Sequence, residues 1–168
     1  MPQYLIANGA SPTTAAQVKV TTGTAIKTML QVKGVTALQF KVIEWGISFD
    51  GSAAATPIAC ELIETGTVFA TVTAHVAAGL VKYGPPGGTP TSTTYFEVGT
   101  TATGYTATAE GTITASRVLD VQLVAPTNQY VKQFPLGREP WVDAVSSLRI
   151  RVTAGAAVNA YCYVIVET

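Results

Sequence analysis

The stretch ALQFKVIEWGISFDG, residues 37–51, decides the fold class of this chain. Its apolar residues form two alternating sets: Leu38, Phe40 and Val42, and then Ile43, Trp45, Ile47 and Phe49. Successive side chains of a strand point to opposite faces, so the second set lies on the face opposite the first. This change predicts a β-bulge or a crossing between two sheets, with Gly46 as a candidate position. The Asp50-Gly51 pair then indicates a hairpin turn, because glycine tolerates positive φ.

Similar strand patterns recur along the whole chain, and no stretch shows a convincing helical period. The predicted strands are residues 25–33, 37–49, 58–64, 68–76, 106–109, 117–124, 130–134, 147–152 and 159–167. Short strands separated by turns rich in Gly, Pro and Thr favour an all-β fold, a two-sheet antiparallel sandwich of jelly-roll-like form. The expected core residues are Trp45, Ile47, Leu119, Val121, Leu123, Ile150, Val152 and Val164.

The last predicted strand, 159–167, is apolar on both faces. Tyr161, Tyr163 and Ile165 alternate with Cys162, Val164 and Val166. A strand of this kind belongs in the middle of a sheet that is covered on both sides, by the second sheet or by a neighbouring subunit.

Two segments interrupt the strand pattern of residues 15–168, which we interpret as a single domain. Residues 1–14 combine a short apolar patch with the sequence NGASPTT, and we expect an N-terminal arm. Residues 83–104 are rich in Gly, Pro and Thr and predict a long loop excursion. Loops of this length are usually functional or mobile.

The charge balance bears on the partners of the chain. Ten basic and ten acidic residues give a net charge of zero, and only 12% of the 168 residues are charged. A neutral surface predicts no nucleic-acid partner. No apolar run reaches the roughly 20 residues that span a bilayer, and no signal peptide is visible, so we expect no membrane partner and synthesis in the cytoplasm.

The residues capable of catalysis or metal binding are few, which predicts that the chain is not an enzyme and has no cofactor or metal. His75 is the only histidine, and we interpret it as a partly exposed structural residue. Glu61 and Glu64 are three apart in a strand, so they point to opposite faces and do not converge. Asp50 is interpreted as a turn residue. Cys60 and Cys162 are expected to be buried thiols, with a disulfide as the alternative.

Aromatic and aliphatic side chains in the two irregular segments are the candidate interface residues. They are Tyr4, Leu5 and Ile6 in the arm, and Tyr83, Tyr95, Phe96 and Tyr105 in or beside the loop. Aromatic residues in loops often anchor protein contacts, because they bury a large area with few rotatable bonds. Two alternatives stay open: these rings pack the loop against its own sandwich, or they stack on a glycan.

Three segments carry a resemblance to a known class of proteins. VIEWGISFDG (42–51), PIACELIETG (57–66) and the tail FPLGREPWV…LRIRVTAGAAVNAYCYVIVE (134–167) resemble small virion proteins of tailed phages of actinobacteria. The likeness covers most of the chain after about Lys33. It implies a capsid decoration (cement) or head-associated protein that stabilises the head by bridging capsomers. The implied partners are the major capsid protein and other copies of this chain, most often in a trimer, on the capsid surface of the virion. The alternative function is a glycan- or receptor-binding module on the virion surface, in the head or the tail.

Overall fold

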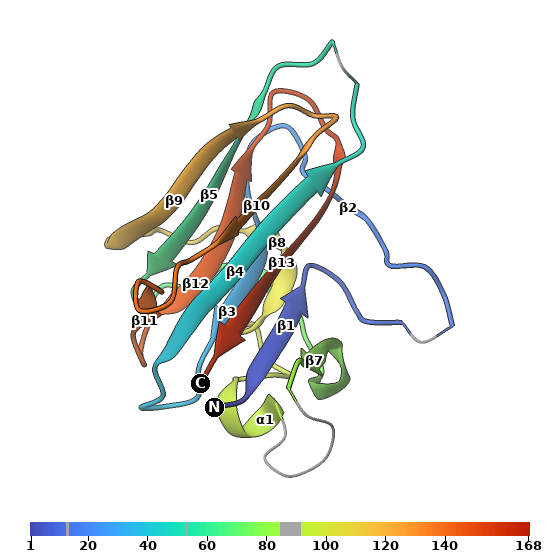
Figure 1. The fold of residues 1–168 in the computed structure, drawn as a ribbon. Coiled ribbons are helices and arrows are strands. Elements are labelled where there is room, and N and C mark those ends of the chain that lie inside the picture. Colours follow the sequence, from blue (N-terminus) through green and yellow to red (C-terminus); the bar gives the residue numbers. More distant parts are fainter. Residues whose placement is uncertain (13, 53, 85–91) are drawn as a thin grey trace.

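The computed structural model describes residues 1–12, 14–52, 54–84 and 92–168, which form two antiparallel sheets packed face to face (Figure 1). The seven-stranded sheet has the order β10 (Gln129–Gln133), β4 (Phe40–Phe49), β13 (Asn159–Glu167), β1 (Gln3–Ala7) and β7 (Leu80–Lys82), with β11 (Trp141–Val142) also on β4 and β2 (Val20–Thr21) on β13. The six-stranded sheet has the order β6 (Thr71–Ala74), β8 (Gly104–Ala109), β3 (Ile26–Lys33), β12 (Ser147–Thr153), β5 (Ile58–Thr65) and β9 (Ser116–Val124). The helical elements are the 3₁₀ turn η1 (Ala77–Gly79) and α1 (Ser92–Tyr95).

Consecutive long strands change sheets instead of pairing with each other. The chain passes from β3 in one sheet to β4 in the other and back to β5, and it changes sheets again from β9 to β10 and from β12 to β13. These crossings confirm the prediction of an all-β, jelly-roll-like sandwich of two antiparallel sheets.

The β-bulge predicted in residues 37–49 exists, but it lies at Ile43 and not at Gly46. The register between β4 and β13 shifts between the pairs Glu44–Ile165 and Val42–Val166, which leaves Ile43 as the extra residue. The bulge lets Phe40 and Val42 before it, and Trp45 after it, face the same core. The strand therefore stays in one sheet along its whole length.

The apolar core lies between the two sheets. Five of the expected core residues are buried there: Trp45, Ile47, Ile150, Val152 and Val164. Leu119 is only partly buried against the core, and the assignment of Val121 and Leu123 to the core is wrong because both are exposed. The register between β5 and β9 shifts at Leu119, so Asp120 and Val124 face the interior instead.

The last strand occupies the middle of its sheet, as its composition predicts, with β4 on one side and β1 on the other. The face of Cys162 and Val164 is covered by the second sheet. Tyr161 and Tyr163 lie on the outer face, where both side chains are partly exposed.

The N-terminal segment is not an arm. Its residues Gln3–Ala7 form β1, which pairs with β13 from Gln3–Glu167 to Ala7–Tyr163 and with β7 on its other edge. Tyr4 and Ile6 are fully buried in the core. The two chain ends consequently lie side by side, as Figure 1 shows.

The excursion at 83–104 is only partly a loop. Residues 85–91 lie outside the described residues, but α1 follows them and Phe96 forms a β-bridge with Gly34. Phe96 is 1% exposed and belongs to the core. The excursion therefore closes one end of the sandwich. The predicted strand 68–76 is shorter in the structure, because only Thr71–Ala74 pairs with β8.

Candidate binding site

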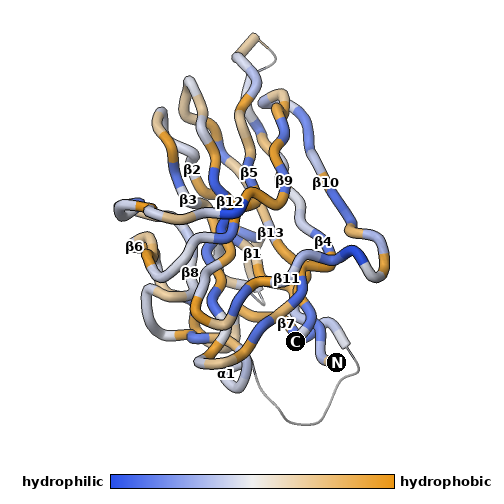
Figure 2. Tube along the Cα trace, turned by 90° about the vertical axis from the view of Figure 1, so that its left-hand side faces the viewer, coloured by the Kyte–Doolittle hydropathy of each residue, from blue (hydrophilic) through white to orange (hydrophobic). Residues whose placement is uncertain are grey.

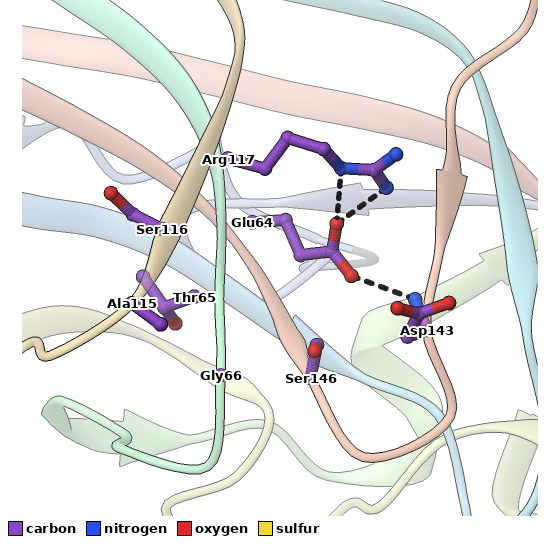
Figure 3. A pocket seen from close by; sticks show the side chains of 8 residues that line it. All are labelled: Glu64, Thr65, Gly66, Ala115, Ser116, Arg117, Asp143 and Ser146. Atoms are coloured by element: carbon purple, nitrogen blue, oxygen red, sulfur yellow. Dashed lines mark hydrogen bonds and ion pairs between the residues drawn. The ribbon is translucent and has the colours of Figure 1, made fainter.

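A hollow at one end of the sandwich contains Glu64 and Asp143 (Figure 3). Oε2 of Glu64 accepts from Arg117 Nε at 2.7 Å, and Oε1 accepts from the backbone N–H of Asp143 at 2.8 Å. Both carboxylate oxygens thus have donors, and Glu64 ties β5 to β9 and to the segment before β12. Glu61 pairs with Arg151 at 2.8 Å on the opposite face of β5, so the prediction that the two glutamates do not converge is confirmed.

His75 is buried, which corrects the expectation of a partly exposed side chain. It is 1% exposed, and its Nε2 lies 2.8 Å from the carbonyl oxygen of Ala7 at the end of β1. A carbonyl oxygen can only accept, so Nε2 carries the proton of the neutral ring. Tyr105 packs against the imidazole with ring centroids 4.8 Å apart. Burial lowers the pKa of His75, which identifies a neutral structural histidine.

The two cysteines and Asp50 have structural roles. Cys60 and Cys162 are free, buried thiols in opposite sheets, as predicted, and burial raises the pKa of both. Asp50 follows β4 directly and pairs with Lys19 at 2.5 Å. The prediction of a hairpin at Asp50-Gly51 is wrong, because β4 and β5 lie in different sheets. Among the described residues, no three side chains of His, Cys, Asp or Glu are grouped so that they would hold a metal ion.

Several predicted interface residues are part of the sandwich itself. The rings of Tyr4 and Phe96 meet edge to face at 5.4 Å, and Phe40 meets Phe96 at 5.7 Å. Tyr95 lies 5.8 Å from Tyr4, and Ile6 is buried in the same core cluster. For Tyr95 and Phe96 the arrangement favours the alternative in which the excursion packs against its own sandwich. Tyr4 and Ile6 are core residues of β1.

The other three predicted residues do not form a common site. Leu5 lies on the outer face of β1 and is partly exposed, Tyr105 packs on His75 in β8, and Tyr83 is an exposed side chain just after β7. Leu5 and Tyr83 thus belong to the seven-stranded sheet or its end, and Tyr105 belongs to the six-stranded sheet.

The first surface that the strand pattern did not reveal is the outer face of β9. Val118, Val121 and Leu123 are 55%, 48% and 74% exposed and form what we call the β9 flank. In the described chain β9 pairs only with β5, so its other edge is open. Figure 1 shows β9 at the edge of its sheet, and Figure 2 shows hydrophobic positions along it. Exposed apolar residues on an open edge are typical of a contact surface.

A buried carboxylate fixes β9 against the other sheet. Asp120 accepts hydrogen bonds from the Trp45 indole at 3.1 Å and the Tyr130 hydroxyl at 2.9 Å, and it forms an ion pair with Lys132 at 3.1 Å. Burial, and then the bond to Asp120, raise the pKa of Tyr130 to about 12. Because Asp120 faces inward, Val121 after it faces outward.

The second surface is a groove on the outer face of the seven-stranded sheet, which we call the tyrosine groove. Cross-strand pairing sets Gln129, Ser48 and Tyr161 in one row, and Val131, Gly46 and Tyr163 in the next. The middle strand β4 thus supplies the two smallest residues. The depression, of about 210 Å³, is lined by Ile47, Ser48, Gln129, Val131, Tyr161 and Tyr163.

The groove depends on Gly46. A Cβ atom at this position would lie 2.7 Å from Cε1 and 3.0 Å from Cζ of Tyr163, so the ring can cross β4 only because glycine is there. The Tyr163 hydroxyl donates to Glu44 at 2.6 Å, and the Tyr161 and Tyr163 rings lie 6.2 Å apart, tilted by 34°. Burial, and then Glu44, raise the pKa of Tyr163.

The sequence indicated one of these surfaces and not the other. Residues 159–167 are apolar on both faces, but the second sheet covers only one of them. The sequence therefore indicated that the other face, which carries Tyr161 and Tyr163, contacts a further partner. In residues 117–124, Leu119, Val121 and Leu123 alternate with Asp120 and Gln122, which is the pattern of a core face opposite a polar one, so the sequence pointed to the wrong face.

Comparisons with protein-family models, with curated protein sequences and with solved structures found no match. In the part of the chain that the structure describes, no helix is both long enough and apolar enough to cross a membrane.

Proposed function

We propose that this chain is a non-enzymatic virion structural protein, a capsid decoration protein that stabilises a phage head by bridging capsomers. Its partners are the major capsid protein and further copies of the same chain, in a trimer on the capsid surface. The resemblance of residues 42–51, 57–66 and 134–167 to small virion proteins supplies the biological setting.

The observation that carries the proposal is the β9 flank. Val118, Val121 and Leu123 expose apolar side chains on an open edge strand. The same chain buries both its cysteine thiols and its histidine. An apolar surface on a rigid sandwich stabilises contacts with another protein when it is covered. The buried bonds of Asp120 hold this strand in place before any partner binds, so little ordering is needed on contact.

Attachment to capsid shells tests the proposal. The purified chain is mixed with shells of the phage that encodes it, stripped of decoration proteins, and co-sedimentation is measured over a range of concentrations. We expect saturable binding. The double variant Val121→Glu, Leu123→Glu should bind at least about tenfold more weakly, because charges replace apolar contacts that are each worth on the order of 1 kcal/mol.

The matched control is Val76→Glu, an equally exposed apolar residue that follows β6 at the other edge of the same sheet. This variant should attach as the unaltered chain does. Absence of saturable binding by the unaltered chain would refute the capsid function. Equal loss in the double variant and the control would show that added charge matters and that the β9 flank does not.

A further inference from the structure

The tyrosine groove has the composition of a ligand site and not of a bare sheet face. Its wall on β13 is formed by the rings of Tyr161 and Tyr163, and its wall on β10 by Gln129 and Val131. Ser48 of β4 lies between these walls, and the Tyr163 ring covers Gly46 beside it. The rings are half-buried, and the bond from Tyr163 to Glu44 fixes one of them. The site is thus formed before a ligand arrives, which lowers the entropic cost of binding.

The groove continues beyond its two central rows. A second depression shares Ser48 and Gln129 with it and extends to Thr127 and Asn128. A third shares Ser48 and Tyr161 and extends to Lys19 and Asn159. Three shallow depressions thus meet at Ser48, and the side chains that surround them are mostly amides and hydroxyls.

Charge narrows the class of ligand. None of the six residues that line the central groove is charged. In the adjoining depression Lys19 and Asp50 form an ion pair with each other at 2.5 Å, and Glu44 at the edge accepts the hydroxyl of Tyr163. A phosphate or a carboxylate would find no unpaired cation among these residues, so an uncharged ligand fits best.

We propose that the tyrosine groove binds a neutral oligosaccharide, with a sugar ring against Tyr161 and Tyr163. A pyranose ring has a C–H face that packs on an aromatic ring and hydroxyl groups at its edge. The side-chain amide of Gln129 and the hydroxyl of Ser48 can each donate and accept a hydrogen bond, as sugar hydroxyls do. The adjoining depressions accommodate further sugar units. This inference does not depend on the capsid function.

The test uses the full chain and a panel of maltohexaose, cellohexaose, mannohexaose, xylohexaose and a β-galactan, with sialyllactose as a charged sugar. Saturation-transfer NMR detects binding, and titration calorimetry measures Kd. We expect at least one neutral sugar to bind. The negative charge of sialyllactose should not lower its Kd below that of the neutral sugars. Tyr161→Ala and Tyr163→Ala should each raise Kd about tenfold or more, since each removes one stacking surface.

Three further variants separate a binding role from a structural one. Gly46→Ala keeps both tyrosines but pushes the Tyr163 ring out of place, so its Kd should also rise. Tyr163→Phe keeps the ring and should retain most of the affinity. Trp141→Ala removes an exposed aromatic side chain of β11 outside the groove and should leave Kd unchanged. Melting temperatures of all variants show which of them are folded.

Two results would overturn the inference. One is that no neutral sugar of the panel binds with a Kd below about 10 mM, the range of very weak complexes. The other is that a sugar binds equally well to the folded Tyr161→Ala and Tyr163→Ala variants. If these variants instead lose attachment to shells or self-association while no sugar binds, the groove is a protein contact and the sugar site is refuted, although the capsid function would stand.

Discussion

Among single residues, the buried side chain of His75, just after β6, connects the end of β1 to β8. Its ring bonds to Ala7 and packs on Tyr105, and burial lowers its pKa from the ordinary value of 6.5. The folded state therefore favours the neutral ring more than the unfolded chain does. The resulting stabilisation is fully present above about pH 6.5 and is lost as the pH falls through the lower pKa of the folded state.

We predict that His75 makes the free energy of unfolding fall between pH 8 and pH 5.5. His75→Gln keeps a donor near the Nε2 position but does not titrate, so its decrease over this range should be smaller. At pH 8 the free energy of unfolding of the variant should be about 1 kcal/mol lower than that of the unaltered chain, the usual contribution of one hydrogen bond. Urea unfolding at several pH values measures both effects, and identical pH profiles of the two proteins would contradict the assignment.

Asp120 and Gly46 illustrate how one residue decides the orientation of a strand or a side chain. The carboxylate of Asp120 has three partners on β4 and β10, and this inward position leaves Val121 on the outside. Gly46 has no such bonds; its missing side chain is what admits the Tyr163 ring. Both effects need knowledge of the neighbouring strand, so neither could be predicted from the chain alone.

Among the elements, every described strand of seven or more residues was predicted from its pattern, whereas β1, β2, β7 and β11 were not. The pattern of residues 37–49 identified β4 and its bulge, and the apolar faces of residues 159–167 identified a central strand. The five-residue β1 has only Tyr4 and Ile6 as its inward face, too short a pattern to distinguish a strand from an arm. Phe96 follows a stretch rich in Gly and Pro, and its place in the core comes from contacts with Tyr4 and Phe40, which are distant in sequence.

The candidate surfaces were less predictable than the strands. The sequence predicted that residues 159–167 are apolar on both faces, with the tyrosines on one of them, but the groove also needs β10 and β4 beside them. The assignment of Val121 and Leu123 to the core is wrong, because an alternating strand does not reveal which of its faces points inward. Sequence alternation gives the period of a strand, and only the packing of both sheets gives its orientation.

We predict that β1 is required for stability, in contrast to the behaviour of a free arm. Ile6 is fully buried between the sheets, so Ile6→Ala should cost about 2–5 kcal/mol. Leu5 is the adjacent residue on the outer face of the same strand, and Leu5→Ala should cost less than about 1 kcal/mol. Thermal unfolding monitored by circular dichroism compares the two variants, and equal losses would show that the pairing of β1 with β13 and β7 is incorrect.

At the scale of the whole molecule, low charge and an open edge act together. The net charge is zero and only 12% of residues are charged, so electrostatic repulsion between copies is weak. One edge of the six-stranded sheet, β9, exposes Val118, Val121 and Leu123, whereas β6 at the other edge is a four-residue strand with two exposed threonines. Self-association is therefore expected on the β9 side.

We predict that the purified chain is a homo-oligomer at micromolar concentration, with the trimer of the proposed function as the expected state. Covering the β9 flank removes three branched apolar side chains from water, each worth on the order of 1 kcal/mol or more when buried. Leu123→Glu would place a charge in that contact and should shift the mass measured by light scattering to that of one 17.4 kDa chain. Val76→Glu adds the same charge at the opposite edge and should leave the oligomer intact. A stable monomer for the unaltered chain would refute the prediction. An oligomer that survives Leu123→Glu would place the contact on another face. The tyrosine groove is the next candidate for that contact, and Tyr163→Ala tests it.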